Sequence, residues 1–171
     1  PPRKLHNSSW GFLCPAETPE GGSVGVVKNL SYMTHVTIPS NSESLYNYAM
    51  KYTTPLKEYI ENTSNFNNIK DKVKVFVNGT WLGITDKPQE LYEYLKDKKV
   101  RGHINIYTSV IFNYRRMEIR VCNDAGRLLR PLLRVKDNLP ILKKTDLDNL
   151  RKGSLSWNDL LTDSKLDNAI I

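Results

Sequence analysis

The sequence contains little cysteine and no long apolar run. Cys14 and Cys122 are the only cysteines among 171 residues, too few for the disulfide framework of a small secreted domain. A single bridge is the alternative to two free thiols in a reducing compartment, and we expect the free thiols. No run of about 18 apolar residues occurs, so no transmembrane helix is predicted. These absences exclude a disulfide-stapled scaffold and a helical membrane span for this stretch of chain.

Motifs for metal binding and covalent catalysis are also missing. The histidines and cysteines have no paired zinc-ligand spacing, and the aspartates form no cluster. Ser23 stands in a G-x-S-x-G string, but a nucleophile elbow needs a strand before the serine and a helix after it. Pro15 and Pro19 precede Ser23, and a β-branched run follows it. An esterase that uses Ser23 is therefore disfavoured.

The charge balance is basic, with a net charge of +7. Such a balance suits a nucleic-acid partner, but it also occurs in many proteins without one. Between Lys98 and Lys136 there are ten Lys or Arg against Glu118 and Asp124. This stretch could follow a phosphate backbone, or it could be a solvated strand face that pairs with acids of neighbouring chains. The second interpretation is favoured, because aromatic residues are not interleaved with the cations as stacking platforms require.

Residues 10–29, WGFLCPAETPEGGSVGVVKN, are crowded with residues that shape the backbone. Proline fixes φ and removes a backbone donor, whereas glycine permits positive φ, here at Gly21, Gly22 and Gly25. No ordinary helix or central strand tolerates so many of both. The apolar residues of the stretch argue against disorder. We predict a rigid, irregular loop.

This loop carries two carboxylates, Glu17 and Glu20, which are three residues apart. Such a pair could perform acid–base chemistry. Alternatively, the carboxylates could bond backbone amides of the loop or pair with Arg3 or Lys28. From the residues alone, this structural alternative is favoured.

The remaining patterns predict an α+β fold, in which an irregular Pro/Gly loop precedes a small mixed module of β-hairpins and two or three helices. Helical spacing of apolar residues predicts helices at 42–53, with Ser42 as the N-cap, at 55–62 and at 88–99. Asn78 and Gly79 predict a type I′ turn within a hairpin over 72–84. Further strands are predicted within 24–38, 104–110, 116–122 and 127–135, with a turn at Asp124-Ala125-Gly126. Polar loops are predicted at 61–68 and 137–150, and a new apolar element at 157–161.

Three blocks resemble the second-largest subunit of multisubunit RNA polymerases of the eukaryotic, archaeal and viral type. These blocks are HNSSWGFLCPAETPEGGSVGVVKNL, VFVNGTWLG and DAGRLLRPLLRV. The resemblance implies a C-terminal part of the fork region at 1–38, an external α+β domain at 39–136, and a linker with the truncated start of the next external domain at 137–171. The chain starts without Met, and we expect a fragment of a longer polypeptide.

The resemblance also implies roles for individual residues. No catalytic or metal-binding residue is expected within the fragment. Support of the active centre is implied for Arg3, His6, Glu17, Glu20 and Lys28. Structural roles are implied for Gly21, Gly25, Asn78, Gly79, Asp124, Gly126, Arg127 and Arg130, with the two arginines tied by carboxylates such as that of Asp124. Ser8 and Ser9 depart from the Thr-His that the family often has before Trp-Gly.

The implied function is enzymatic only in an assembled DNA-directed RNA polymerase, a nucleotidyltransferase. Mg²⁺ would be held by the largest subunit, because the two-metal chemistry needs clustered carboxylates. The implied partners are the largest and smaller subunits, template DNA and RNA, and no membrane. The location would be the nucleus or, for a viral homologue, the host cytoplasm or virion. The alternative is a free-standing basic α+β module that binds RNA or protein.

Overall fold

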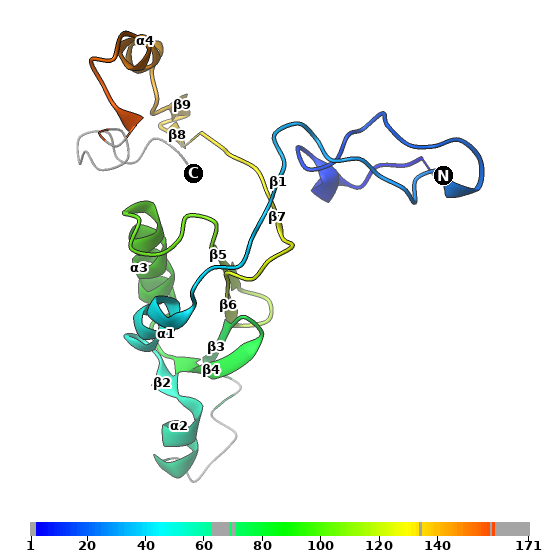
Figure 1. Ribbon diagram of the computed structural model, residues 1–171. Coiled ribbons are helices and arrows are strands. Elements are labelled where there is room, and N and C mark those ends of the chain that lie inside the picture. The colour runs from blue at the N-terminus through cyan, green and yellow to red at the C-terminus, as the bar shows by residue number, and fades with distance from the viewer. Residues whose placement is uncertain (1–2, 63–68, 70, 134, 158, 160–171) are drawn as a thin grey trace. The chain divides into compact units, whose positions relative to one another are not determined.

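The computed structural model describes residues 3–62, 69, 71–133, 135–157 and 159 (Figure 1). The chain divides into two compact units, Ile38–Ala125 and Pro1–Thr37 with Gly126–Ile171. Both contain irregular segments and strands, and helices occur in each. The predicted α+β class is confirmed, whereas the domain boundaries implied by the resemblance stay predictions.

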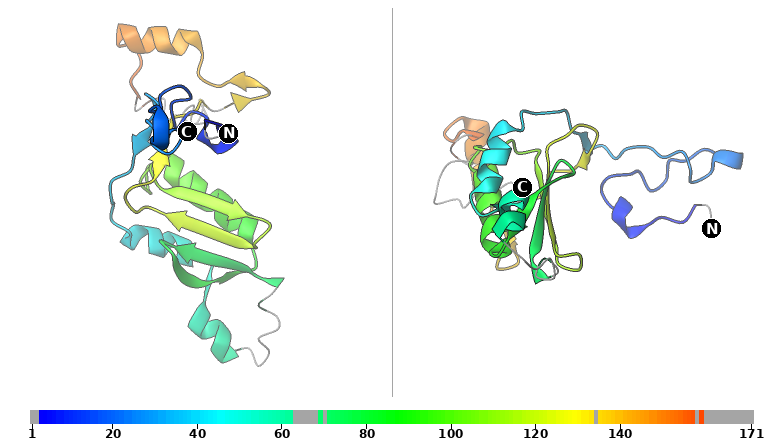
Figure 2. Two further views of the ribbon diagram at one scale, coloured as in Figure 1. Left: turned by 90° about the vertical axis from the view of Figure 1, so that its right-hand side faces the viewer. Right: turned by 90° about the horizontal axis from the view of Figure 1, so that it is seen from below.

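The unit Ile38–Ala125 is built on a five-stranded sheet of order β2-β4-β3-β6-β5. Its β3 and β6 are parallel and its other neighbours antiparallel. The strands are β2 Thr54–Pro55, β3 Val73–Val77, β4 Thr80–Thr85, β5 Ser109–Asn113 and β6 Glu118–Cys122. The helices are α1 Glu43–Met50, α2 Leu56–Asn62 and α3 Pro88–Val100. Helices α1 and α3 lie on the same face of this sheet (Figure 2).

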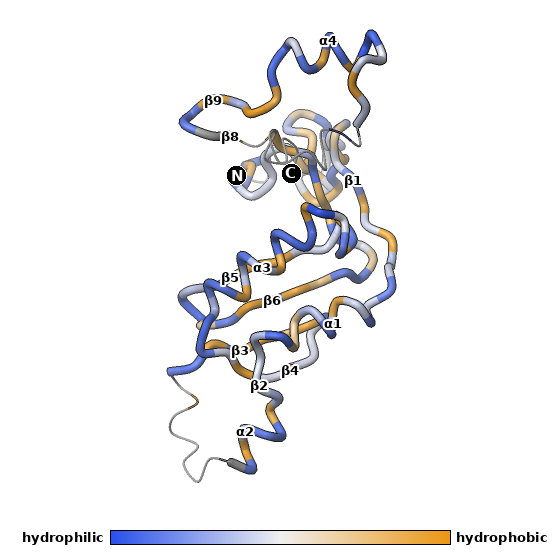
Figure 3. Tube along the Cα trace, turned by 90° about the vertical axis from the view of Figure 1, so that its left-hand side faces the viewer, coloured by the Kyte–Doolittle hydropathy of each residue, from blue (hydrophilic) through white to orange (hydrophobic). Residues whose placement is uncertain are grey.

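The core lies between that sheet face and the two helices. Alternate residues of β3 and β6 are buried, and apolar residues spaced four apart on each helix meet them, as period-two and helical patterns require. Hydropathy colouring shows these largely apolar strands (Figure 3). The buried cluster contains Leu45, Ala49, Val73, Val75, Val77, Leu91, Leu95, Ile104, Val110, Ile119 and Val121.

The predicted hairpin is confirmed in β3 and β4. Asn78 and Gly79 adopt φ of 49° and 80°, the left-handed backbone that a type I′ turn requires. The Asn78 side chain also enters a buried polar network around Asn123, which is 4% exposed. Its Nδ2 donates to Asn123 Oδ1 at 2.7 Å, and its Oδ1 accepts from the backbone amide of Asn123 at 2.9 Å. The turn is therefore held by the chain that follows β6.

The predicted side-chain cap of the first helix is wrong, because Ser42 takes part in the same network. Ser42 occupies the N-cap position of α1, but its hydroxyl donates to Asn123 Oδ1 at 2.9 Å instead of capping the helix. The Glu43 amide donates to Asn41 Oδ1 at 2.9 Å. The helix ends at Met50, earlier than the predicted residue 53. The helices predicted at 55–62 and 88–99 are confirmed.

The strand predicted at 104–110 is wrong in its bounds, because β5 begins at Ser109 and ends at Asn113. The reason is a turn at Asn105. Its Oδ1 accepts from the Tyr107 amide at 2.8 Å and its carbonyl from the Thr108 amide at 2.9 Å. An asparagine side chain that bonds the backbone two residues on competes with strand pairing. The apolar Ile104 is buried in the core without being in a strand.

In the other unit, β1 His35–Val36 pairs with β7 Leu128–Leu129. One short strand therefore lies within 24–38, as predicted, but residues 24–27 are not in a strand, and the strand predicted over 127–135 is wrong in length. The amides of Val24 and Val26 bond the carbonyls of Gly21 and Ser23, so this stretch bonds locally and not to a neighbouring strand. A short 3-10 turn at Gly21–Ser23 begins this local pattern.

The polar loop predicted at 137–150 is wrong, because this stretch contains regular secondary structure. Strands β8 Val135–Lys136 and β9 Leu139–Pro140 form a hairpin, and α4 Lys144–Lys152 follows. The Lys143 amide donates to Asp146 Oδ2 at 2.9 Å, and Gly153 with φ of 75° ends the helix. The polar loop predicted at 61–68 and the apolar element at 157–161 lie mostly outside the described residues.

Cys14 and Cys122 are free thiols, as expected. Within the described residues, no helix has the length and apolar character needed to cross a bilayer.

Candidate functional site

The predicted irregular loop is an ordered structure closed at its base by a two-residue bridge. Leu13 and Leu30 face each other as an isolated antiparallel pair. The Cys14 amide donates to the Asn29 carbonyl at 2.8 Å. The Asn29 side chain reaches further into the loop and donates to the Glu17 carbonyl at 3.3 Å. These bonds join the two sides of the loop at its base, away from its tip.

One threonine organises the interior of the loop. The Thr18 hydroxyl accepts from the Gly25 amide at 2.8 Å and donates to the Val27 carbonyl at 3.1 Å. It thereby satisfies two backbone groups that have no helix or sheet to bond them. Gly25 and Gly21 adopt φ of 73° and 86°, the conformation that a side chain disfavours, whereas Gly22 does not have positive φ.

Arg130 joins the second sequence block to the loop. Its guanidinium lies 5.0 Å from the centroid of the Phe12 ring, within the range of a cation–π contact. Gly11, with φ of 76°, makes this approach possible, because a Cβ at that position would lie 2.1 Å from Arg130 Nη1. The Thr34 hydroxyl donates to the Phe12 carbonyl at 2.7 Å. Among the described residues, Arg130 thus contacts an aromatic ring and forms no ion pair, and the structural role expected of it stays a prediction.

The turn that precedes Arg130 is anchored on Thr37, which is 3% exposed. The Gly126 amide donates to the Thr37 carbonyl, and the Arg127 amide to the Thr37 hydroxyl, both at 3.0 Å. The Thr37 amide donates in return to the Arg127 carbonyl at 3.0 Å. Gly126 adopts φ of 81°, as the predicted turn requires. Arg127 is therefore fixed through its backbone.

The five residues expected to support an active centre are all exposed: Arg3, His6, Glu17, Glu20 and Lys28. The described residues contain no ion pair that involves any of them. The expected pairing of the loop carboxylates with Arg3 or Lys28 is therefore not seen in this part of the chain. His6 instead closes a local turn, since its Nδ1 accepts from the Ser8 amide at 3.2 Å and lies 2.7 Å from the Ser8 hydroxyl.

The loop has no arrangement for covalent or metal chemistry in the described part of the chain. Ser23 ends the 3-10 turn Gly21–Ser23 and has no strand before it, so the nucleophile-elbow geometry is absent there. No three His, Cys, Asp or Glu residues that the structure describes lie close enough together to hold a metal ion. What the loop offers is a rigid backbone that presents two carboxylates and a lysine to its surroundings.

Sequence reasoning missed the residues that hold the loop. Thr18, Asn29 and Thr34 bond backbone groups 7 to 23 positions away in the sequence. A signal was present, because Ser, Thr and Asn beside Pro and Gly commonly bond nearby backbone. The partners could not be assigned, since contacts over this separation depend on the path of the whole loop.

Comparison with known proteins gives the same assignment for both units. Residues 1–36 match the family pattern described as RNA polymerase Rpb2, domain 3. Residues 75–136 match RNA polymerase Rpb2, domain 4. The two matches lie in sequence order; the first contains the loop, and the second contains β4, β5, β6 and most of β3.

Individual relatives extend over nearly the whole chain. DNA-directed RNA polymerase II subunit RPB2 of Encephalitozoon cuniculi is 39% identical over 94% of this chain. DNA-directed RNA polymerase III subunit RPC2 of Drosophila melanogaster is 34% identical over 97% of it. DNA-directed RNA polymerase subunit 2 of Acanthamoeba polyphaga mimivirus is 35% identical over 94%. The chain spans only 13% to 14% of the length of these relatives.

Proposed function

The chain belongs to the family of second-largest RNA polymerase subunits, and from this premise we propose that its loop forms a wall beside the active centre of the assembled enzyme. The α+β unit Ile38–Ala125 docks other subunits in the same assembly. The contribution to DNA-templated RNA synthesis is positional. A free-standing RNA- or protein-binding module is not favoured, because polymerase subunits align along 94% of the chain.

The observation that carries the proposal is the internal bonding of the loop. Thr18 satisfies two backbone groups, and Arg130 packs on Phe12. The exposed carboxylates of Glu17 and Glu20 are therefore presented from a backbone that is already ordered. Groups held in place before substrate arrives lower the entropic cost of reaching a reactive geometry. The loop suits placement of the template, the nucleotide or the elements that close over them.

Metal chemistry is assigned elsewhere in the assembly. The described residues of this chain do not group three potential ligands, so they do not fit a Mg²⁺ site. In the proposal the ions belong to the largest subunit, and the residues of this chain act around them. The partners are the largest and smaller subunits with template DNA and RNA. The setting is the nucleus, or the host cytoplasm or virion for a viral enzyme.

The proposal is tested on a polymerase assembled with its full-length second-largest subunit. Deleting the loop tip, residues 19–22, should slow nucleotide addition at least tenfold while the subunits still co-purify. The matched control replaces Asp137 and Asn138 by Gly-Gly. Both residues already have positive φ, so this turn should tolerate the change and retain full activity. Unchanged elongation after the tip deletion would overturn the proposal.

A further inference from the structure

Strand β5 is an edge strand without the usual protection. It is the last strand of the five-stranded sheet, and its sequence SVIFN contains no charge and no proline. It pairs with β6 in continuous register over five residues, without a bulge. The opposite edge, β2, has only two residues and leads directly into α2. Natural sheets blunt exposed edges with charges, proline, bulges or short strands, and β5 uses none of these.

Apolar side chains lie on both faces of this edge. On the helix side, the Phe112 ring lies 4.1 Å from that of Tyr114 and 6.3 Å from that of Tyr92, measured between centroids. Lys96 Nζ lies 5.1 Å from the Tyr92 centroid. On the other face, Ile111 is 53% exposed. An added strand would therefore find apolar contacts for its side chains on either face.

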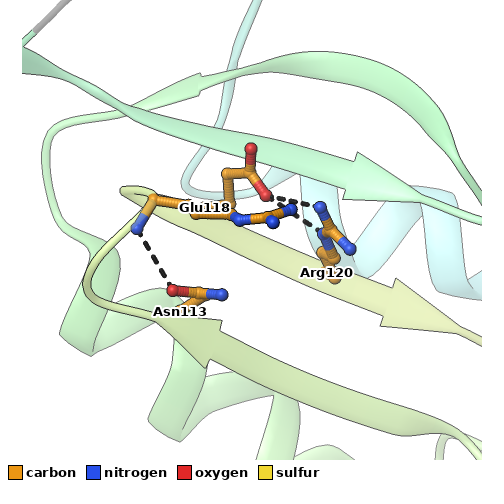
Figure 4. Close-up of polar contacts among 4 residues, drawn as sticks. Asn113, Glu118 and Arg120 are labelled. Carbon is orange, nitrogen blue, oxygen red and sulfur yellow. Dashed lines mark hydrogen bonds and ion pairs between the residues drawn. The ribbon is translucent and has the colours of Figure 1, made fainter.

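The surroundings of the edge are basic. Arg115 and Arg116 are exposed in the turn that follows β5. The one acidic residue of β6, Glu118, already accepts from Arg120 at 2.8 Å (Figure 4). The Lys96 ammonium lies over the Tyr92 ring and has no ion pair among the described residues. Charge complementarity thus favours an acidic partner.

We propose that β5 accepts an extended segment of a neighbouring protein chain, rich in Asp or Glu and in apolar residues, as a sixth strand of the sheet. Backbone hydrogen bonds to the outer edge of β5 would supply affinity, and side-chain contacts would supply specificity. The acidic residues would meet Lys96 and Arg115, and the apolar ones Ile111 and Phe112. This inference rests on the proposed function and deepens it, because it names the docking surface and the chemistry of its partner.

Two other occupants are less suited to this edge. A second copy of the chain would carry the same basic residues Lys96, Arg115 and Arg116 to the shared edge and no acidic segment to meet them, and like charges on both partners are unfavourable. A single-stranded nucleic acid has no backbone amides to continue the ladder and would instead need stacked rings on an open face. Both are therefore outcomes that would contradict the proposal.

The first test places a photo-crosslinking amino acid at Ile111 in the full-length subunit within the purified polymerase. Ile60 on α2, at the opposite edge of the sheet and 44% exposed, is the matched control position. The crosslinked peptide is identified by mass spectrometry. The expected product from position 111 is an acidic, apolar segment of another polypeptide, absent from the control. A crosslink to nucleic acid, to a second copy or to a basic segment, or no crosslink, would overturn the proposal.

The second test measures amide hydrogen exchange of residues 110–113. Exchange should be at least tenfold slower in the assembled enzyme than in this chain alone, because a sixth strand bonds the outer amides. Ile111→Glu, which places a negative charge against the acidic partner and removes an apolar contact, should abolish that protection, and Ile60→Glu should not. Equal exchange rates in both states would contradict strand addition.

Assembly itself separates this inference from the function on which it rests. If the subunit co-purifies and makes RNA but β5 is neither crosslinked nor protected, only the sixth strand is wrong. If the subunit does not assemble into a polymerase, the proposed function fails. The double variant Arg115→Glu/Arg116→Glu should reduce the crosslink yield at least fivefold without changing DNA affinity. Loss of DNA affinity with an unchanged crosslink would favour a nucleic-acid role for this turn and contradict the acidic partner.

Discussion

The Arg130 guanidinium lies over the Phe12 ring at 5.0 Å, although 118 positions separate the two residues in the sequence. Arg130 belongs to the DAGRLLRP block and Phe12 to the block that contains CPAETPEG. The contact brings the two distant blocks together in one structure. It also assigns a function to Gly11, whose missing side chain leaves room for the arginine.

Gly11→Ala should therefore weaken the loop more than Gly21→Ala. Both glycines have positive φ, which costs a side chain about 1–2 kcal/mol. Only at Gly11 would a Cβ also displace Arg130, whereas nothing lies within 4 Å at Gly21. Hydrogen exchange of the Cys14 amide, bonded to Asn29, measures local opening. The free energy of opening should fall by roughly 1 kcal/mol more in Gly11→Ala than in Gly21→Ala, which is the order of a cation–π contact. Equal effects would contradict the Arg130 contact.

Thr18→Val should loosen the interior of the loop while keeping the shape of the side chain. The Gly25 amide would lose its acceptor and the Val27 carbonyl its donor. Each lost bond is worth about 0.5–1.5 kcal/mol. The Gly25 amide should exchange roughly tenfold faster. Thr80→Val is the control, because the exposed Thr80 hydroxyl makes no hydrogen bond among the described residues. No change at Gly25 would show that the loop is held by other contacts.

Asn123→Ala should destabilise the α+β unit strongly. The Asn123 side chain accepts from Ser42 and Asn78 and donates to Ser40 and Asn41, all near the start of α1 or in the hairpin turn. Its removal leaves the partly buried polar groups of Ser40, Ser42 and Asn78 without this partner, at about 1–3 kcal/mol for each group that water does not reach.

Urea denaturation should show that the free energy of unfolding falls by at least about 2 kcal/mol, as for other broken buried networks. Asn47→Ala, on the exposed side of α1, is the control and should change little. A similar small change in Asn123→Ala would mean that water replaces the lost bonds.

Local sequence patterns predicted the secondary-structure elements that depend mainly on residues close together in the sequence. The Asn78-Gly79 turn and the apolar spacing of Leu91 and Leu95 depend on neighbours in the sequence, and the β3–β4 hairpin and α3 were found as expected. Helix α4 was missed because few of its residues are apolar and none is buried. The capping residue Asp146 was therefore not followed by the apolar spacing that identifies a helix.

The site was predicted less completely than the fold. Prolines and glycines identified residues 10–29 as an irregular loop, because their backbone limits are intrinsic. The partners of Thr18 and Arg130 depend on tertiary contacts that no period in the sequence encodes. The same holds for β5, whose start was displaced by the Asn105 turn. The roles assigned to Arg3, His6, Glu17, Glu20 and Lys28 stay predictions.

Glu20→Gln in the assembled polymerase should change the rate of elongation and leave assembly intact. Glu20 is exposed and precedes the turn Gly21–Ser23 without capping it, so loss of its charge removes no bond seen in the described residues. A charge that helps to place substrate affects the chemical step and not folding, and we expect a rate change of at least threefold. Single-nucleotide addition is followed by rapid quench, with co-purification of the subunits measured in parallel. Glu43→Gln, exposed at the start of α1, is the control. If Glu20→Gln prevents assembly, the carboxylate has a structural role at a subunit interface. If it changes neither rate nor assembly, Glu20 does not support the active centre.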